Sequence, residues 1–273
     1  MTCRARGGFC AKTGCVLRVE PFAEADLTHD AMLGGKAMIR QPRVGYRAGT
    51  DPVLLAATIE AKPGQSVLEL GCGAGPGLCC LGARVPGVQL YGIELQPAYA
   101  ALARRNLSEN GLGGTVWEGD LSAPPPEMRA LSFHHVMANP PYFEAGRGIA
   151  AQDAGRGLGR AGETPLATWV AVAAKRLRPR GYMTFIQRAE RLPELLAAMQ
   201  AHVGALELLP LLPRPGRAPR LVLVRGRKDG KAAFRFHPPQ VIHAPGEHED
   251  GVNNYSEAFT KVMKHGAGLP FSE

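Results

Sequence analysis

Apolar runs of strand length alternate with helical patterns over most of the chain from residue 66 onward. Apolar residues three and four positions apart predict a helix that ends at residue 84, and further helices over 97–110, 165–177 and 192–202. Alternating strands and helices indicate an α/β fold with a doubly wound, mostly parallel, seven-stranded sheet. No helix separates the last two strands, so we expect an antiparallel hairpin at the edge of the sheet. The runs that predict strands are 66–70, 89–94, 115–120, 133–138, 181–187, 205–210 and 221–225.

A glycine-rich turn follows the first predicted strand. Gly71, Gly73 and Gly75 carry no Cβ atom, so backbone N–H groups can approach a ligand closely. The N-terminus of the next helix also favours an anionic group. Because ligands of such sheets bind beyond the carboxyl ends of the strands, the turn is a candidate cofactor site.

Carboxylates stand at the ends of the neighbouring strands. Glu94 ends the second strand, where its oxygens can accept hydrogen bonds from both hydroxyls of a ribose. Asp120 ends the third strand and can meet an adenine amine. Glu69 precedes the glycine turn and can orient a water molecule or the amino-acid part of a ligand. Leu95 and Leu121 follow the two strand-end carboxylates and are assigned to the same cofactor site.

Two cofactors compete for such a turn, NAD and S-adenosylmethionine. The NAD fingerprint is G-x-G-x-x-G, whereas Pro76 follows Gly75 here. An acidic residue just before G-x-G-x-G is typical of class I methyltransferases. The sequence therefore predicts S-adenosylmethionine as the cofactor and a Rossmann-like class I methyltransferase fold.

The run Asn-Pro-Pro-Tyr at 139–142 ends the fourth predicted strand, on the same rim as the glycine turn. Two prolines in a row can also form a merely rigid turn. A catalytic role explains the residue set better, because the Asn139 amide oxygen and the Pro140 carbonyl can accept both N–H bonds of an amine. The nitrogen lone pair then points at the methyl donor, and positive charge developing on nitrogen is stabilised. Tyr142 can stack on a base drawn out of its helix or loop.

This run after a G-x-G-x-G turn resembles the amino methyltransferases of nucleic acids and the glutamine-N5 methyltransferases of release factors. Segments 45–55, 220–224 and 254–260 resemble those of bacterial tRNA adenine-N6 methyltransferases, which modify adenine 37 of valine tRNA. The likeness runs from about residue 27 to residue 271. It implies that Thr50 and Asp51 hold the methionine end of the cofactor and that Tyr255 belongs to a closing C-terminal segment. It also adds Pro141, Arg160, Arg220 and Tyr255 as substrate-binding candidates.

Composition favours a polyanionic partner. The formal net charge is +8 and the pI about 9.4. Basic residues outnumber acidic ones between 175 and 231, either as a solvated surface or as a face that follows phosphates. No apolar run is long enough for a membrane span, and no set of ligands has metal spacing. Six cysteines without CxxC pairs fit a reduced, cytoplasmic compartment.

We therefore expect an enzyme that transfers a methyl group from S-adenosylmethionine to adenine N6 in tRNA. We expect a leader over residues 1–26, disordered or added by an upstream start codon, and a methyltransferase domain over 27–273. A monomer is favoured, with no membrane and no metal. The alternatives are methylation of a protein glutamine, adenine-N6 methylation of rRNA or DNA, and a binding module without catalysis.

Overall fold

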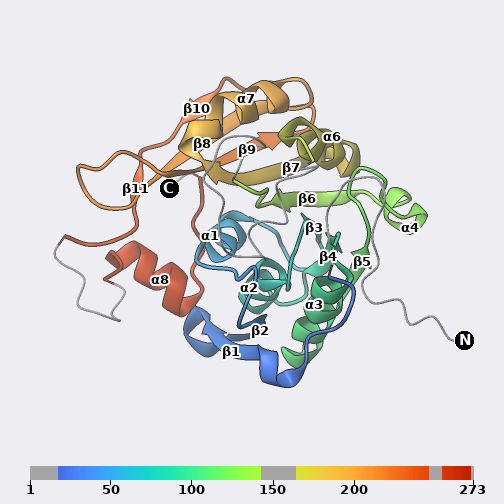
Figure 1. Ribbon diagram of the computed structural model, residues 1–273. Coiled ribbons are helices and arrows are strands. Elements are labelled where there is room, and N and C mark those ends of the chain that lie inside the picture. The colour runs from blue at the N-terminus through green and yellow to red at the C-terminus, as the bar shows by residue number, and fades with distance from the viewer. Residues whose placement is uncertain (1–17, 143–163, 246–253, 272–273) are drawn as a thin grey trace, which may run out of the picture.

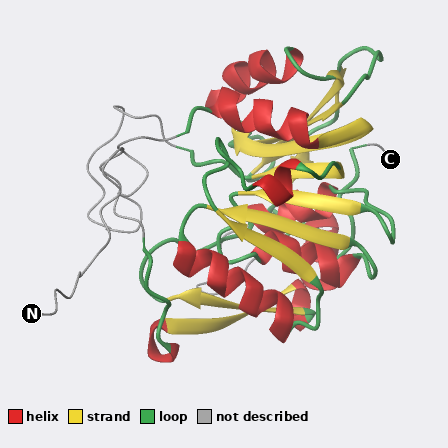
Figure 2. Cartoon of the chain, turned by 90° about the vertical axis from the view of Figure 1, so that its right-hand side faces the viewer, coloured by secondary structure: helices red, strands yellow, loops and turns green. Residues whose placement is uncertain are grey.

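A mixed sheet with helices on both faces forms the body of the chain (Figures 1 and 2). The structure, a computed structural model, describes residues 18–142, 164–245 and 254–271. The strand order is β10-β8-β9-β7-β6-β3-β4-β5, and β11 pairs with β8. The strands are β3 (Ser66–Leu70), β4 (Gln89–Glu94), β5 (Gly114–Glu118), β6 (Phe133–Ala138), β7 (Leu177–Arg188), β8 (Gly204–Leu212), β9 (Leu221–Arg227), β10 (Arg235–Phe236) and β11 (Gln240–Val241).

Two apolar layers cover the sheet, one on each face. One core cluster joins the sheet to α1 (Asp51–Thr58), α2 (Pro76–Arg84), α3 (Pro97–Glu109) and α8 (Glu257–His265). The other joins it to α4 (Pro126–Arg129), α6 (Leu166–Arg176) and α7 (Leu192–Gln200). Burial on both faces explains why β3 is mostly apolar, with Ser66 and Glu69 as its polar residues. No described helix is long and apolar enough to cross a membrane.

The seven predicted strands are all present, and the predicted antiparallel pairing of the last two is confirmed. β3, β4, β5, β6 and β7 are parallel, whereas β9 is antiparallel to both β7 and β8. The hairpin lies at this edge of the sheet as predicted, with β9 inserted between β7 and β8. The two-residue strands β10 and β11 pair outside β8 and are too short to give a sequence pattern.

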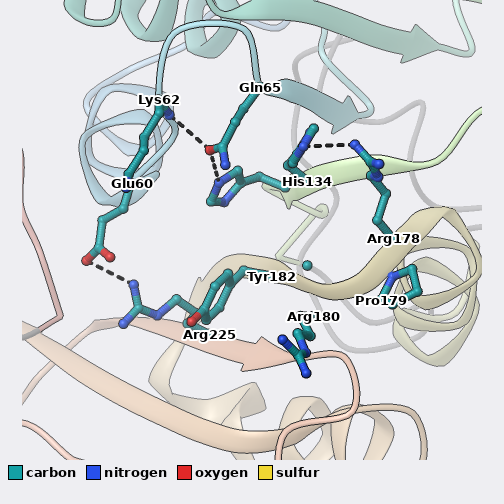
Figure 3. A pocket seen from close by; sticks show the side chains of 11 residues that line it. Glu60, Lys62, Gln65, His134, Arg178, Pro179, Arg180, Tyr182 and Arg225 are labelled. Carbon is teal, nitrogen blue, oxygen red and sulfur yellow. Dashed lines mark hydrogen bonds and ion pairs between the residues drawn. The ribbon is translucent and has the colours of Figure 1, made fainter.

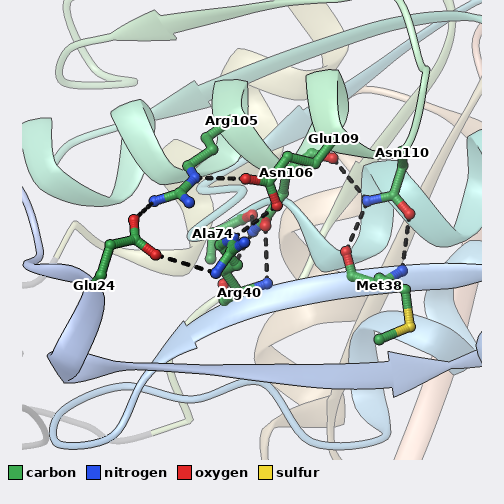
Figure 4. Close-up of polar contacts among 8 residues, drawn as sticks. All are labelled: Glu24, Met38, Arg40, Ala74, Arg105, Asn106, Glu109 and Asn110. Atoms are coloured by element: carbon green, nitrogen blue, oxygen red, sulfur yellow. Dashed lines mark hydrogen bonds and ion pairs between the residues drawn. The ribbon is translucent and has the colours of Figure 1, made fainter.

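A second, two-stranded sheet was not expected from the sequence. It pairs β1 (Leu27–Met32) with β2 (Ala37–Pro42) in antiparallel register. Asn106 of α3 and Asn110, which caps the C-terminus of that helix, bind the free edge of β2 (Figure 4). The Asn106 amide bonds the N–H and C=O of Arg40 at 2.8 and 3.0 Å, and the Asn110 amide bonds those of Met38 at 2.8 and 2.7 Å. These side chains replace the neighbouring strand that β2 lacks.

Residues 18–26, which we assigned to the leader, pack against α3. The Phe22 and Tyr99 rings meet edge to face at 5.1 Å, and the Ala98 N–H donates to the Arg18 carbonyl at 3.2 Å. Glu24 forms ion pairs with Arg40 and Arg105 (Figure 4). Residues 1–17 lie outside the described residues, and the boundary between leader and domain stays a prediction.

Candidate active site

The glycine turn after β3 is built from left-handed backbone. Gly71, Gly73 and Gly75 have φ values of 63°, 54° and 80°. A Cβ atom on Gly71 would lie 2.5 Å from the ring of Trp169 on α6, so a side chain at this position is excluded by packing as well as by φ. The Gly73 N–H donates to the Glu94 carboxylate at 2.9 Å. The turn and the end of β4 therefore form one unit.

Glu94 meets the requirements of a ribose-binding carboxylate. It is 8 % exposed and accepts a second backbone hydrogen bond, from the Gln96 N–H at 2.9 Å. Burial raises its pKa, and the backbone donors oppose that shift. Each oxygen accepts one backbone bond and retains acceptor capacity for a hydroxyl. The next residue, Leu95, is 44 % exposed beside it, an apolar surface of the kind that a nucleoside covers.

Glu69 lies beneath the turn. Its carboxylate contacts the first turn of α2, where a Cβ atom on Gly77 would come within 2.6 Å of it. Burial raises the pKa of Glu69 to about 8; the Leu78 N–H lowers it, and the nearby Glu94 raises it further. One carboxylate oxygen is buried without a hydrogen-bond partner among the described residues. An unpartnered buried acceptor beside the turn fits a site completed by a ligand with a donor or a positive charge.

The loop after β5 brings Asp120 to the same edge. The Gly119 N–H donates to the Glu94 carbonyl at 2.9 Å, which ties this loop to β4. Asp120 is exposed, and one oxygen accepts from the Ser122 N–H at 2.8 Å. Leu121 packs in the core cluster that contains Ile93. The fold thus brings the predicted cofactor residues of three strand ends together, and the residues present fit S-adenosylmethionine.

The Asn-Pro-Pro-Tyr loop follows β6 at the same edge. In the register of the sheet, Leu70 pairs with both Ala138 and Ile93, so Asn139 and Glu94 leave the strands on either side of the glycine turn. Neighbouring strands lie about 4.8 Å apart. Asn139 is half-buried, and its amide has no hydrogen bond to a described residue, whereas Pro140 is buried.

Tyr142 connects this loop to the start of α1. Its hydroxyl donates to the Asp51 carboxylate, which also accepts from the Thr50 hydroxyl at 3.3 Å. Burial raises the pKa of Tyr142, and the Asp51 carboxylate adds to the shift, so the phenol stays protonated and keeps donating. The hydrogen bond therefore joins a predicted substrate residue to a predicted cofactor residue.

Three functional candidates were missed by sequence reasoning. The Tyr46 ring lies 3.5 Å from the Cβ position of Gly73, so it covers the glycine turn. Burial raises the pKa of Tyr46, as do nearby carboxylates led by Glu69. Arg191 donates to the Pro141 carbonyl at 3.1 Å, and the Arg188 guanidinium lies 5.5 Å from the centre of the Tyr142 ring. Segment 45–55 and the basic excess of 175–231 were the available signals, but neither singled out these residues.

The remaining predicted substrate residues are Arg220, Tyr255 and Arg160. Arg220 lies on the active-site edge, because its carbonyl accepts from the Ala189 N–H at 3.0 Å, just past the end of β7. The Tyr255 ring stacks on His243 at 5.2 Å, and none of its described contacts reaches the Asn139 loop. Arg160 lies outside the described residues. The substrate roles of all three stay predictions.

The sequence profile of the methyltransferase small domain family matches residues 48–209. The chain belongs to this family. The match spans the glycine turn, the strand-end carboxylates and the Asn-Pro-Pro-Tyr loop, and it confirms the methyltransferase prediction with S-adenosylmethionine as the cofactor.

Two curated relatives align with most of the chain. The tRNA1(Val) (adenine(37)-N6)-methyltransferase of Haemophilus influenzae is 26 % identical over 233 residues, covering 83 % of this chain and 93 % of the relative. The enzyme of the same name from Porphyromonas gingivalis is 29 % identical over 217 residues, covering 75 % and 84 %. The release factor glutamine methyltransferase of Geobacter sulfurreducens is 33 % identical, but over only 36 % of this chain and 33 % of the relative. The resemblance to the tRNA adenine-N6 family is confirmed.

Solved structures confirm the fold. A predicted O-methyltransferase from Agrobacterium tumefaciens, 23 % identical, superposes with a TM-score of 0.64 over 81 % of this chain and 98 % of that one. The 16S rRNA N2 G1207 methyltransferase of Thermus thermophilus, 20 % identical, superposes with a TM-score of 0.51 over 74 % of this chain and 50 % of that one. Both likenesses concern the Rossmann-like methyltransferase architecture.

Proposed function

We propose that this protein methylates the exocyclic N6 of an adenine in tRNA, at position 37 of valine tRNA. The observation that carries the proposal is the half-buried Asn139 amide, which has no hydrogen bond to a described residue and stands beside the glycine turn. The names of the Haemophilus and Porphyromonas relatives, which align over most of the chain, support the substrate.

The residues of the loop hold and orient the amine. The Asn139 side-chain oxygen and the Pro140 carbonyl accept its two N–H bonds, which turns the nitrogen lone pair out of conjugation with the purine. Bound S-adenosylmethionine supplies an electrophilic methyl group on a sulfonium. Tyr142 stacks on the base, and its hydrogen bond to Asp51 fixes the ring relative to α1. Holding the amine in line with the methyl group also lowers the entropic cost of the reaction.

The charge of the active-site edge supports an RNA substrate. Arg188, Arg191 and Arg220 stand there, at the end of β7 and the start of β9. Guanidinium groups bind backbone phosphates without reading sequence. We propose that these residues position the anticodon arm, while the loop selects the amine. We further propose that the protein acts in the cytoplasm and as a monomer.

The test is incubation of the protein with labelled S-adenosylmethionine and total tRNA, followed by nuclease digestion and mass spectrometry. Label on N6-methyladenosine at position 37 of valine tRNA is expected, and Asn139→Ala should abolish it. Label on another nucleotide, or none with any tRNA, would overturn the proposal.

The second candidate is N5-methylation of a protein glutamine, favoured by the partial match to a release factor glutamine methyltransferase. A glutamine amide presents the same NH2 group to Asn139 and Pro140. The two candidates differ in salt dependence, because an RNA substrate releases counterions on binding. Activity on tRNA should fall steeply between 50 and 200 mM salt, as expected for several phosphate contacts. Methylation of a release factor with no tRNA activity would favour the second candidate.

A further inference from the structure

The basic residues of the region 175–231 divide between the two edges of the sheet. β7 and β9 are antiparallel, so Arg188 and Arg220 lie at the active-site edge, while Arg180 and Arg227 lie at the opposite edge. We call this the amino edge, since β3, β6 and β7 begin there. The six residues of β6 separate the two edges by about 20 Å. The amino-edge cations therefore serve no group in the methyl-transfer site directly.

A cavity of about 640 Å³ opens at the amino edge (Figure 3). The segment before β3 supplies Lys62 to its wall, the start of β6 supplies His134, and β7 supplies Arg178, Arg180 and Tyr182. Its volume is in the range of small-molecule sites.

The charge lining this cavity is only partly compensated. Arg225 pairs with Glu60 at 2.9 Å and with Glu207 at 2.8 Å. Lys62, Arg178 and Arg180 form no ion pair with any residue that the structure describes. Three cations that share one hollow raise its potential and favour an anionic ligand.

The hydrogen bonds of His134 hold one of these cations in place. Its Nδ1 lies 3.1 Å from the Ser66 N–H and 3.0 Å from the Ser66 hydroxyl, which can accept a hydrogen from Nδ1. Desolvation lowers the pKa of His134, and Arg178 lowers it further, which keeps the ring neutral. The Arg178 Nη1 lies 2.9 Å from Nε2, and because a guanidinium has only donors, Arg178 donates and Nε2 accepts. This bond fixes the Arg178 side chain at the wall of the cavity.

Arg180 is held in a conformation that its side chain disfavours. Its φ is 63°, in the left-handed region, and its carbonyl accepts from the Arg227 Nε at 3.3 Å. Strained backbone of this kind is found at ligand sites. Figure 3 shows the Arg180 guanidinium beside the same hollow as Tyr182.

We propose that this cavity binds a phosphate group through the guanidinium groups of Arg178 and Arg180. The Tyr182 ring already packs against His135 at 6.0 Å and against the guanidinium groups of Arg225 and Arg227, so the ring is not assigned to a base. The phosphate belongs either to a free nucleotide or to the backbone of an RNA that reaches around the edge of the sheet.

The test is calorimetry with inorganic pyrophosphate on the full chain, saturated with S-adenosylhomocysteine to fill the cofactor site. Arg178→Gln with Arg180→Gln should weaken binding at least about tenfold, as expected from the loss of two charge-assisted contacts. The matched control, Lys231→Gln with Lys264→Gln, removes the same charge from exposed lysines outside the cavity and should leave affinity unchanged. Equal affinity in both double variants, or no binding by the unchanged protein at millimolar pyrophosphate, would overturn the proposal.

A single variant separates binding from folding. Arg180→Gly suits the left-handed backbone, so its Tm should not fall while pyrophosphate affinity does; a lower Tm with unchanged affinity would contradict the proposal. Titrations with AMP and with tRNA identify the source of the phosphate. The phosphate belongs to a free nucleotide if the double arginine variant binds AMP more weakly but binds tRNA with unchanged affinity. The phosphate belongs to the RNA backbone if the double arginine variant binds tRNA more weakly and its affinity for tRNA depends less steeply on salt concentration.

Discussion

Asn106 joins three parts of the molecule, and its replacement by alanine is the most direct test of how the cofactor turn is supported. The side chain is fully buried, at 0 % exposure. Its amide makes the two bonds to Arg40 on β2 and donates to the carbonyl of Ala74, in the glycine turn, at 2.8 Å (Figure 4). Asn110, one helical turn further on, makes the same pair of bonds to Met38 but is only half-buried and does not contact the turn.

The structure sets the size of the expected effect. Asn106→Ala leaves three backbone groups without a hydrogen-bond partner, namely the N–H and C=O of Arg40 and the C=O of Ala74. Each costs about 1–3 kcal/mol when it is buried without a partner. The Arg40 bonds are partly buried, so the total loss in free energy of unfolding should be about 4 kcal/mol. Water can reach the Met38 groups in Asn110→Ala, where about 1 kcal/mol is expected. At about 3 °C per kcal/mol, Tm should fall by roughly 10 °C and 3 °C respectively.

Urea unfolding at a fixed pH measures the stabilities, and calorimetry with S-adenosylmethionine measures the affinity of the turn. Asn106→Ala should also weaken cofactor binding, because the Ala74 carbonyl loses its anchor, while Asn110→Ala should bind normally. If the two variants lose the same stability to within 1 kcal/mol and bind cofactor equally, Asn106 does not support the turn.

Three further outcomes are expected. Asn139→Ala should lower kcat at least about a hundredfold without changing cofactor affinity, measured by calorimetry; weakened cofactor binding would mean that Asn139 supports the fold instead. Tyr142→Phe should lose the hydrogen bond to Asp51 but keep the aromatic ring, so its kcat/KM should fall about tenfold. Tyr142→Ala also loses the ring, so its kcat/KM should fall much further. Equal losses in the two variants would show that the ring does not stack on the base. Burial raises the pKa of Glu69 from 4.5 to about 8, so the unfolded chain loses this proton at a lower pH than the folded protein does. The free energy of unfolding should therefore fall as the pH rises between these two pKa values. Between pH 6 and 8 the free energy of unfolding should fall by about 2 kcal/mol, and urea unfolding of Glu69→Gln should show no such fall. If the variant keeps the pH dependence of the unchanged protein, a group other than Glu69 causes it.

The sheet could be predicted because its strands are buried on both faces and carry their own pattern. The β1–β2 hairpin could not, since β1 reads Leu-Thr-His-Asp-Ala-Met and has no apolar run. Its free edge is paired by Asn106 and Asn110, which stand about seventy residues away in the chain. Contacts at such separation leave no local signal in one sequence.

The candidate site divides in the same way. The glycine turn, Glu94 and the Asn139 loop were predicted, since each consists of residue types that the chemistry requires at a strand end. Tyr46 and Arg191 were missed, because their contacts with Gly73 and Pro141 depend on how separate segments pack. The bond between Tyr142 and Asp51 likewise joins two motifs that the sequence presents as independent.

The antiparallel insertion of β9 distributes the basic region between two edges of the sheet. In the sequence, residues 175–231 form one cationic stretch, which could be either a solvated surface or a single face that follows phosphates. In the fold, β7 ends where β9 begins, so Arg188 and Arg220 meet at the active-site edge although 32 positions separate them. The same pairing returns Arg227 beside Tyr182 at the amino edge. A parallel β9 would have brought its first residues to the amino edge, leaving the rim beside Tyr142 without Arg220. The strand direction therefore supplies positive charge to the methyl-transfer site and to the cavity behind it.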